Sequence, residues 1–301
     1  MNNRIHDEQM RALDVDSVAS EAFGLIKRWA SESAKDNWRD RIGVPTGFHN
    51  IDMHIRGLCS GDLMLVTGAP GVGKTSFALN LAAKTAGLGA SVLLVSLEAS
   101  AAMSLIRMCA GDARVKLDKV LRGRLSKSDW CSIVDAFARL GELDLRICDD
   151  PRLTLDTLRT DLQMLDEKAN ASLVIIDGIE LATEIDGGQT TRACIRGRAI
   201  ELKRLAREMG VPIVATVDYG PGFRHRVKDY EGVLKALPNG VEGVADSIIH
   251  IERNPALKDS RKAPSQGLAE VIIAKSRACM PAKTRLAFVS GYQRFMDYVD
   301  V

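Results

Sequence analysis

One glycine-rich stretch constrains the fold of this chain more than any other. Residues 68–75 fit the pattern G-x-x-x-x-G-K-[ST], in which backbone N–H groups surround a phosphate. The apolar run 63–66 precedes it and predicts a buried strand, and apolar residues at helical spacing over 75–88 predict a helix. Strand, glycine loop and helix in this order predict an α/β phosphate-binding fold. The alternative is a chance glycine turn before an ordinary helix.

The residue types in this loop suit the binding of a polyphosphate. Glycines allow successive N–H groups to turn towards phosphate, and the helix N-terminus adds positive potential. Lys74 is expected to reach the β- and γ-phosphates, and the Thr75 hydroxyl to bind Mg²⁺. The predicted nucleotide-binding residues are Gly68, Ala69, Pro70, Gly71, Val72, Gly73, Lys74, Thr75 and Ser76.

Composition narrows the class of protein. The formal net charge is only +2, so contact with nucleic acid would depend on local basic clusters. The six cysteines are scattered without a C-x-x-C pair, which argues against a disulfide framework or a zinc site and suits a reducing cytoplasm. No apolar run reaches the ~20 residues of a membrane span, and the first residues lack a signal-peptide core.

Two predicted strands end in acidic residues beside the phosphate loop. The run 91–97 ends at Glu98, which is expected to orient and deprotonate the attacking water, or else to be an N-terminal acid of the next helix. The run 172–176 ends at Asp177, which is expected to hold Mg²⁺ directly or through water. Strand ends of this kind are where α/β sheets place catalytic groups.

Several segments predict helices with one apolar face. Val15, Val18, Ala22, Ile26 and Trp29 give the N-terminal arm an apolar stripe, which packs on its own domain or docks on a neighbouring subunit. Residues 101–141 predict helices whose second apolar face is core, and this face consists of Trp130, Ile133, Val134, Phe137 and Leu140.

Basic residues gather in two later segments. The predicted helix after 185–191 exposes a basic face made of Arg192, Arg196, Arg198, Lys203, Arg204 and Arg207. Such a face is either solvated or contacts a nucleic-acid backbone. The glycine-bearing loop 219–228 carries Arg224 and Arg226, and is a phosphate track or an ordinary surface loop. Four strand-like runs joined by short turns, 247–251, 268–274, 284–289 and 294–298, predict a partly antiparallel sheet edge.

From about Val44 to Val301 the chain resembles the C-terminal motor domain of DnaB-type replicative DNA helicases, a RecA-like class. The matching segments are 46–48, 57–58, 61–63, 68–75, 77–80, 96–100, 123–125, 129–130, 175–177, 202–203, 205–208, 211–212, 274–277, 286–288 and 294–295. The resemblance implies a RecA-like α/β phosphate-loop ATPase domain over 43–301, preceded by a helical arm and linker over 1–42.

The resemblance also implies a ring of six subunits with ATP and Mg²⁺ at each interface. On that pattern Lys275 and Arg277 form a basic pair that reaches the γ-phosphate bound by the adjacent subunit; the alternative is a charged strand end. Single-stranded DNA would be contacted by Asn239 and Gly240 of the DNA loop, with Arg192, Arg196, Arg224 and Arg226 as further candidates. Other replication proteins are possible partners, and no membrane is expected.

Several positions depart from the family pattern. The family's N-terminal helical domain is expected to be absent. Asp218 stands where the family usually has glutamine, and the family's Tyr-Leu-Gln after the acidic strand end is Gly178-Ile179-Glu180 here. The DNA loop Leu-Arg-Glu-Ser-Gly becomes 237–240, without the arginine and the acid, and Asn-Gly after Arg277 becomes Ala278-Cys279. ATP binding is expected to be intact, whereas DNA coupling is altered.

Three functions follow as hypotheses. The first is an ATP-hydrolysing DNA helicase motor acting on single-stranded DNA in replication. The second is a helicase-derived structural or loader-like subunit without unwinding activity, which the departures favour. The third is a RecA-type recombinase or clock-type ATPase, which the 96–98 and 275–277 segments disfavour.

Overall fold

The computed structural model describes most of the chain. It covers residues 43–150, 154, 156–160, 162, 172–181, 192–218, 227, 229–238, 240–258 and 266–299, and scattered positions between 15 and 27. The chain divides into two compact units, Met1–Ile42 and Gly43–Val301. In the first unit the described positions, which are 15, 18–20, 22–24 and 26–27, are helical.

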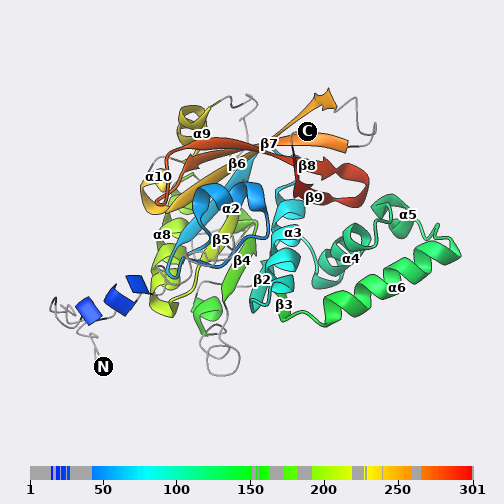
Figure 1. Cartoon of the computed structure of the whole chain (residues 1–301), viewed down its shortest axis with the longest axis horizontal. Helices are drawn as coiled ribbons and strands as arrows, with labels where there is room; N and C mark the ends of the chain where they lie inside the picture. Colours follow the sequence, from blue (N-terminus) through cyan, green and yellow to red (C-terminus); the bar gives the residue numbers. More distant parts are fainter. Residues whose placement is uncertain are drawn as a thin grey trace, which may run out of the picture. The chain divides into compact units, whose positions relative to one another are not determined.

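The described part of the second unit is built on a sheet with the strand order β3-β2-β4-β5-β1-β6-β7-β8-β9 (Figure 1). The strands are β1 (Leu63–Gly68), β2 (Val92–Ser96), β3 (Leu145–Cys148), β4 (Leu173–Asp177), β5 (Ile213–Asp218), β6 (Ser247–Lys258), β7 (Gln266–Lys275), β8 (Ala282–Val289) and β9 (Arg294–Asp297). Strands from β3 to β6 in this order pair in parallel, and β6 to β9 pair antiparallel. The predicted α/β class, with an antiparallel C-terminal edge, is confirmed.

Helices cover both faces of the sheet. They are α2 (His49–Ile55), α3 (Lys74–Gly87), α4 (Ala101–Asp112), α5 (Leu117–Leu121), α6 (Lys127–Gly141), α8 (Arg192–Met209), α9 (Tyr230–Ala236) and α10 (Val241–Val244), with short 3₁₀ turns η1 (Ile179–Leu181) and η2 (Ser290–Tyr292). Alternate strand residues separate into two cores: Met64 and Val66 join the core of α2, α3, α4 and α6, and Leu63 and Leu65 join that of α8, α9 and α10. The period of two along a strand explains this division.

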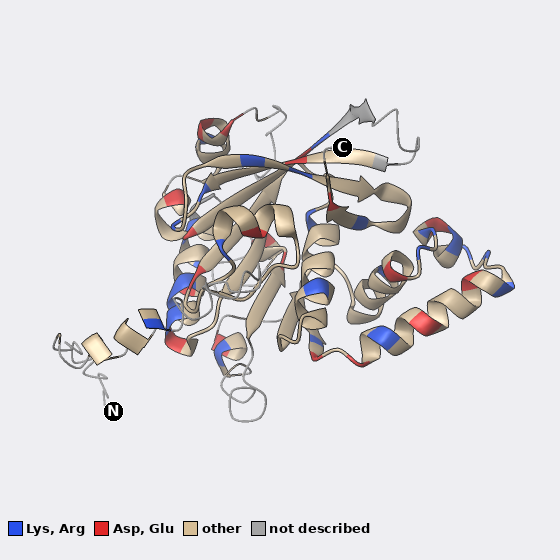
Figure 2. Ribbon diagram, viewed as in Figure 1, with Lys and Arg blue, Asp and Glu red and all other residues tan. Residues whose placement is uncertain are grey.

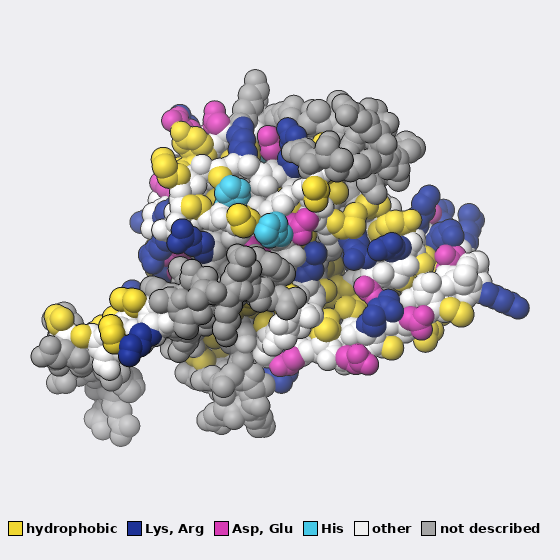
Figure 3. Space-filling view, in the orientation of Figure 1, with side chains coloured by type: hydrophobic (Ala, Val, Ile, Leu, Met, Phe, Trp, Pro, Cys, Tyr) yellow, Lys and Arg dark blue, Asp and Glu magenta, His cyan; other side chains and the backbone are white. Residues whose placement is uncertain are grey.

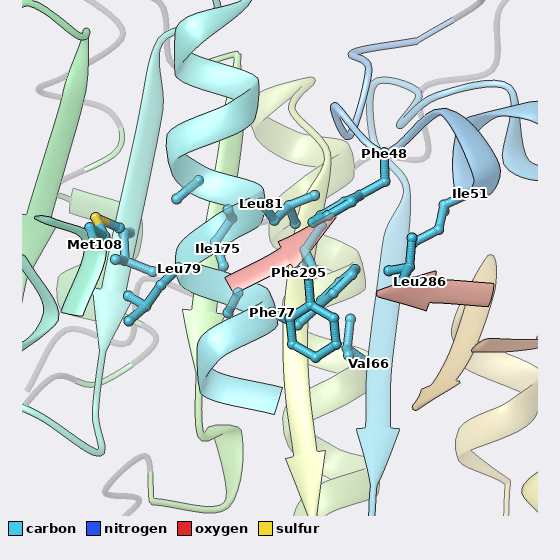
Figure 4. Packing of buried hydrophobic residues seen from close by; sticks show 14 of the residues in the cluster. Phe48, Ile51, Val66, Phe77, Leu79, Leu81, Met108, Ile175, Leu286 and Phe295 are labelled. Atoms are coloured by element: carbon cyan, nitrogen blue, oxygen red, sulfur yellow. The ribbon is translucent and has the colours of Figure 1, made fainter. Parts of the chain in front are cut away.

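An aromatic cluster joins the phosphate-loop helix to the C-terminal strands. Phe77 of α3 stacks on Phe48 with ring centroids 5.1 Å apart, and meets Phe295 of β9 edge-on at 5.7 Å (Figure 4). Phe295 in turn lies 4.4 Å from the Phe288 ring of β8. All four side chains are buried, so this cluster fixes the start of α3 against the antiparallel edge of the sheet.

The predicted core face of α6 is wrong in part. Ile133 and Leu140 are buried, but Trp130, Val134 and Phe137 are 58%, 59% and 41% exposed. The helix packs along α4 on one side only, so apolar residues one position away from the buried row face outward. Hydrophobic side chains are accordingly visible at the surface in Figure 3.

The basic face predicted for α8 also needs correction. Lys and Arg residues do concentrate along the ribbon of this helix (Figure 2). Arg198, however, is buried and donates hydrogen bonds to the carbonyl oxygens of Ile179 (3.1 Å) and Glu180 (2.9 Å). Lys203 pairs with the buried Asp246. Both positions lie next to the apolar row of α8, so their polar ends reach backbone and carboxylate partners of the same unit.

Among the described residues, no helix is long and apolar enough to cross a membrane.

Candidate active site

The phosphate loop joins β1 to α3 with the conformation that its glycines permit. Gly71 and Gly73 have φ angles of 74° and 111°, which side-chain-bearing residues rarely adopt. Gly68 is needed for space, because a Cβ there would lie 2.7 Å from the carbonyl oxygen of Ile251 on β6. Helix α3 begins at Lys74, so the loop residues 68–73 lie at a helix N-terminus, where anions bind favourably.

Lys74 points back into the loop. Its ammonium donates hydrogen bonds to the carbonyl oxygens of Gly68 (3.1 Å) and Ala69 (3.3 Å), and it forms an ion pair with Asp218. Asp218 is the last residue of β5 and is aligned with Gly68 in the parallel β1–β5 pairing. The sheet register therefore places a carboxylate directly beside Lys74, the predicted phosphate-binding residue.

Glu98 and Thr75 are brought together. The Thr75 hydroxyl donates a hydrogen bond of 2.7 Å to Glu98 Oε2. Glu98 follows β2 by two residues, and β2 is separated from β1 by β4 and β5, so the contact spans the carboxyl edge of the parallel strands. The predicted general base and the predicted magnesium ligand are thus neighbours in the structure.

Asp177 lies at the end of β4, opposite Ser96 of β2 in the register. Its Oδ1 accepts a hydrogen bond of 2.9 Å from Thr216, whose hydroxyl in turn accepts one of 2.7 Å from the Gly178 N–H. Its Oδ2 is buried with no hydrogen-bond partner among the described residues. Burial raises the pKa of Asp177 to about 6, opposed by the Thr216 hydrogen bond.

The residues at this point fit a magnesium ion. Burying a carboxylate oxygen without a partner costs free energy. Carboxylate oxygens are ligands that Mg²⁺ prefers, so a bound ion would satisfy this oxygen. Thr75 supplies a hydroxyl close enough to Asp177 to lower the pKa of that carboxyl. Thr75 and Asp177 are therefore the residues that would hold Mg²⁺.

Three further carboxylates crowd the same edge. Carboxylate oxygens of Glu98, Glu180 and Asp218 all lie within 4.8 Å of one another. Glu180 is in η1 and accepts a hydrogen bond of 3.4 Å from the Asp218 N–H. Burial, followed by the adjacent Asp218 charge among the effects that raise it, brings the pKa of Glu180 to about 7. The site therefore combines the positive potential of the phosphate loop with a cluster of carboxylates.

Lys275 and Arg277 lie towards the end of the sheet where the parallel strands begin, away from the phosphate loop. Lys275 ends β7 beside Ile248, near the start of β1, and donates to the carbonyl oxygens of Glu242 (2.6 Å) and Ala245 (2.7 Å). Burial lowers the pKa of Lys275. In the sheet register Lys275 is level with Leu65, three residues before Gly68, and its ammonium is bonded on the side away from the phosphate loop.

Arg277 is held at that edge by a buried acid. Its Nε lies 2.6 Å from Oδ1 of Asp246, whose side chain is fully buried, while the Arg277 side chain remains 66% exposed. Asp246 Oδ2 also accepts hydrogen bonds from the Leu63 N–H (2.7 Å) and from Lys203 (2.5 Å). The guanidinium is thus positioned and accessible, but it is not part of its own chain's phosphate site.

Two of the predicted nucleic-acid residues are neighbours. Arg196 is exposed on α8, and a Cβ built on Gly240 would lie 2.7 Å from its Nε. Arg192 begins α8, but its side chain lies outside the described residues, as do Arg224, Arg226 and Asn239.

Sequence reasoning missed two residues beside the loop. Arg253 of β6 donates a hydrogen bond of 3.1 Å to the Val72 carbonyl oxygen, and its guanidinium lies 4.4 Å from the Phe288 ring centroid. Gln293 accepts a hydrogen bond of 2.6 Å from Ser76, the last predicted loop residue. Only the pairing of β1 with β6 and the packing of the β8–β9 turn on α3 bring these residues to the site.

The sequence model of the family described as "DnaB-like helicase C terminal domain" matches residues 43–297. This chain belongs to that family. Curated relatives include the replicative DNA helicase DnaB of Leifsonia xyli subsp. xyli, 28% identical over 90% of this chain and 59% of its own length. The DnaB of Haemophilus influenzae is 32% identical over 87% of this chain and 57% of its own length. The chain therefore spans less than two thirds of these DnaB relatives.

Solved structures agree on the fold of this DnaB-family chain. A solved ATPase domain superposes with a TM-score of 0.81 at 23% identity, covering 96% of this chain and 100% of that structure. A DnaB-like replicative helicase, reported with its interactions with primase, gives a TM-score of 0.80 at 22% identity, covering 95% of this chain and 69% of its own. At such identities the likeness establishes a RecA-like fold alone.

Proposed function

We propose that this chain is an ATP-hydrolysing motor of the replicative-helicase type, acting on single-stranded DNA. The observation that carries the proposal is the convergence of Lys74, Thr75, Glu98 and Asp177 at one edge of the parallel sheet. Family membership of the same segment supports the proposal.

Each residue has a defined task in hydrolysis. The N–H groups of the loop and Lys74 hold the β- and γ-phosphates. Thr75 and Asp177 would hold Mg²⁺, which would neutralise charge on the phosphate oxygens. Glu98 accepts a proton from the water whose oxygen attacks the γ-phosphorus. The bond to the β,γ-bridging oxygen breaks, and ADP and phosphate are released.

The basic pair belongs to a neighbouring active site in this proposal. Lys275 is bonded to the carbonyl oxygens of Glu242 and Ala245, and Arg277 is held by Asp246 at the start of β1, so both side chains are directed away from the loop of their own chain. An exposed arginine fixed by a buried carboxylate is well suited to stabilise γ-phosphate charge across an interface, a contribution of about 10³–10⁵ in rate. This geometry supports a closed ring with ATP between subunits, which we take to be a hexamer.

DNA contact is assigned to the exposed side of α8. Arg196 beside Gly240 offers a cation at a point where the backbone approaches closely. Arg192, Arg224, Arg226 and Asn239 complete the proposed single-strand track, whose affinity would fall with salt as phosphate contacts do. A cytoplasmic location and association with other replication proteins complete the proposal.

The proposal is tested by measuring ATP hydrolysis with and without single-stranded DNA. We expect DNA to stimulate hydrolysis, and we expect Lys74→Ala to abolish it while leaving the fold intact. If no DNA stimulates hydrolysis by the folded protein, the motor assignment is wrong.

A second candidate is a nucleotide-binding subunit without unwinding activity. The observation that favours it is the ion pair between Lys74 and Asp218, which places a carboxylate where phosphate would bind. Co-assembly with a complete replicative helicase, measured by mass in the presence of ATP, separates the two candidates. A module of this kind joins the helicase ring, whereas an independent motor forms its own.

A further inference from the structure

The ammonium of Lys74 contacts three groups of its own chain. Its three partners are the carbonyl oxygens of Gly68 and Ala69 and the carboxylate of Asp218. The two carbonyl oxygens accept hydrogen bonds from the ammonium, and the Asp218 carboxylate forms an ion pair with it. The phosphate oxygens of a polyphosphate would therefore compete with the Asp218 carboxylate for the charge of Lys74.

The displaced partner is expected to be Asp218, because phosphate oxygens compete for the same charge. The two carbonyl oxygens belong to the loop that surrounds the phosphate, whereas Asp218 is on a separate strand, β5. The sheet register fixes Asp218 opposite Gly68, and its N–H donates to Glu180 Oε2. The backbone of Asp218 is therefore fixed at the strand end, and a rotation of its side chain is what would separate the carboxylate from Lys74.

Charge near the phosphate adds to this cost. Glu98, Glu180 and Asp218 lie within 4.8 Å of one another, so Asp218 released from Lys74 would face two carboxylates as well as the nucleotide. Like charges at such distances repel, more strongly at a partly buried site than in water.

We propose that Asp218, positioned by Glu180, sets the nucleotide affinity of this site by competing with the β- and γ-phosphates for Lys74. The inference rests on the proposed nucleotide site, because it deepens the account of that site. Competition for Lys74 predicts which nucleotides bind less tightly. Asp218 should weaken the binding of nucleoside di- and triphosphates, whose phosphates contact Lys74, and not the binding of a monophosphate.

The test compares the wild type with Asp218→Asn, which keeps the shape and removes the charge, and Asp218→Gln as a second neutral variant. The probes are adenosine 5′-(β,γ-imido)triphosphate and AMP, each with Mg²⁺, titrated by calorimetry. We expect the neutral variants to bind the triphosphate about tenfold more tightly, with AMP unchanged. The matched control is Asp118→Asn, which removes the partner of Arg122 in a surface ion pair and should change neither affinity.

A double-mutant cycle shows whether Lys74 mediates the effect. In a Lys74→Ala background, Asp218→Asn should improve triphosphate binding by about threefold or less, because only general repulsion remains. An equal gain in both backgrounds, or a wild-type affinity within twofold of both neutral variants, would overturn the inference. If the folded wild type and all variants failed to bind the triphosphate, the proposed nucleotide site itself would be wrong. Thermal unfolding confirms that each variant is folded.

Discussion

The Thr75 hydroxyl donates a 2.7 Å hydrogen bond to Glu98, although Thr75 lies in α3 and Glu98 follows β2 by two residues. Glu98 is thereby held beside the first turn of α3, next to the phosphate loop. The contact links the proposed magnesium ligand to the proposed base, and it gives Glu98 a role that a helix-capping acid would not have.

Replacing Glu98 by Gln should reduce the rate of ATP hydrolysis with little loss of nucleotide affinity. The amide keeps the hydrogen bond to Thr75 but cannot accept a proton, and general-base catalysis contributes about 10²–10⁴ in rate. Single-turnover hydrolysis and calorimetric binding of a non-hydrolysable analogue measure the two quantities separately. A variant that hydrolyses ATP at the wild-type rate would remove Glu98 from the mechanism.

Asp177 should make stability depend on pH. Burial raises the pKa of Asp177 from 3.8 to about 6, so the folded chain retains a proton that the unfolded chain has already lost in this window. Its contribution to stability therefore falls as pH rises from about 4 to about 6. Asp177→Asn should be more stable than the wild type by an amount that grows through this window and then levels, at roughly 3 kcal/mol.

The measurement for Asp177 is thermal unfolding at a series of pH values, without nucleotide or divalent cation. Other groups titrate in the same range, among them His250, whose pKa burial lowers to about 4. The difference between variant and wild type isolates Asp177 from them. A difference that stays constant between pH 4 and pH 7 would contradict the assignment.

The aromatic cluster should contribute strongly to stability. Phe295 is fully buried against Phe77 and Phe288, and truncation of a buried phenylalanine to alanine costs about 3–5 kcal/mol. Phe137 on α6 is the matched control. Its side chain is 41% exposed, so its replacement by alanine should lower the free energy of unfolding much less. Chemical denaturation of Phe295→Ala and Phe137→Ala compares them; equal losses would show that the cluster does not hold α3 as described.

Much of the fold can be predicted from the sequence, because local patterns determine it. The strand, glycine loop and helix around Lys74 need only neighbouring residues. Apolar runs predict the strands that end at Ser96, two residues before Glu98, and at Asp177. Four short strand-like runs near the C-terminus predict the antiparallel edge, and the structure confirms it.

The remaining features depend on contacts between distant segments. Apolar spacing predicts a buried face on α6, but Trp130 is exposed because the helix has a packing partner on one side only. The sequence predicts Arg198 as a surface cation, whereas in the structure its guanidinium donates hydrogen bonds to carbonyl oxygens of η1. The position of Arg253 beside Val72 and the approach of Glu180 to Asp218 follow from sheet order and register, which local sequence does not reveal.

The central claim is that each active site combines the phosphate loop of one chain with Arg277 of its neighbour. It is tested most directly by mixing Lys74→Ala and Arg277→Ala subunits and measuring ATP hydrolysis. Each variant alone should be nearly inactive. At an equal ratio about one interface in four joins an intact Lys74 to an intact Arg277, and an arginine supplied in trans should restore hydrolysis there.

The control mixture is Lys74→Ala with Glu98→Gln, whose lesions lie on the same side of every interface and leave no intact site. The account predicts that the Lys74→Ala and Arg277→Ala mixture recovers a clear fraction of wild-type hydrolysis and that the control mixture does not. Hydrolysis no greater than that of the separate variants, or full activity in Arg277→Ala alone, would contradict it.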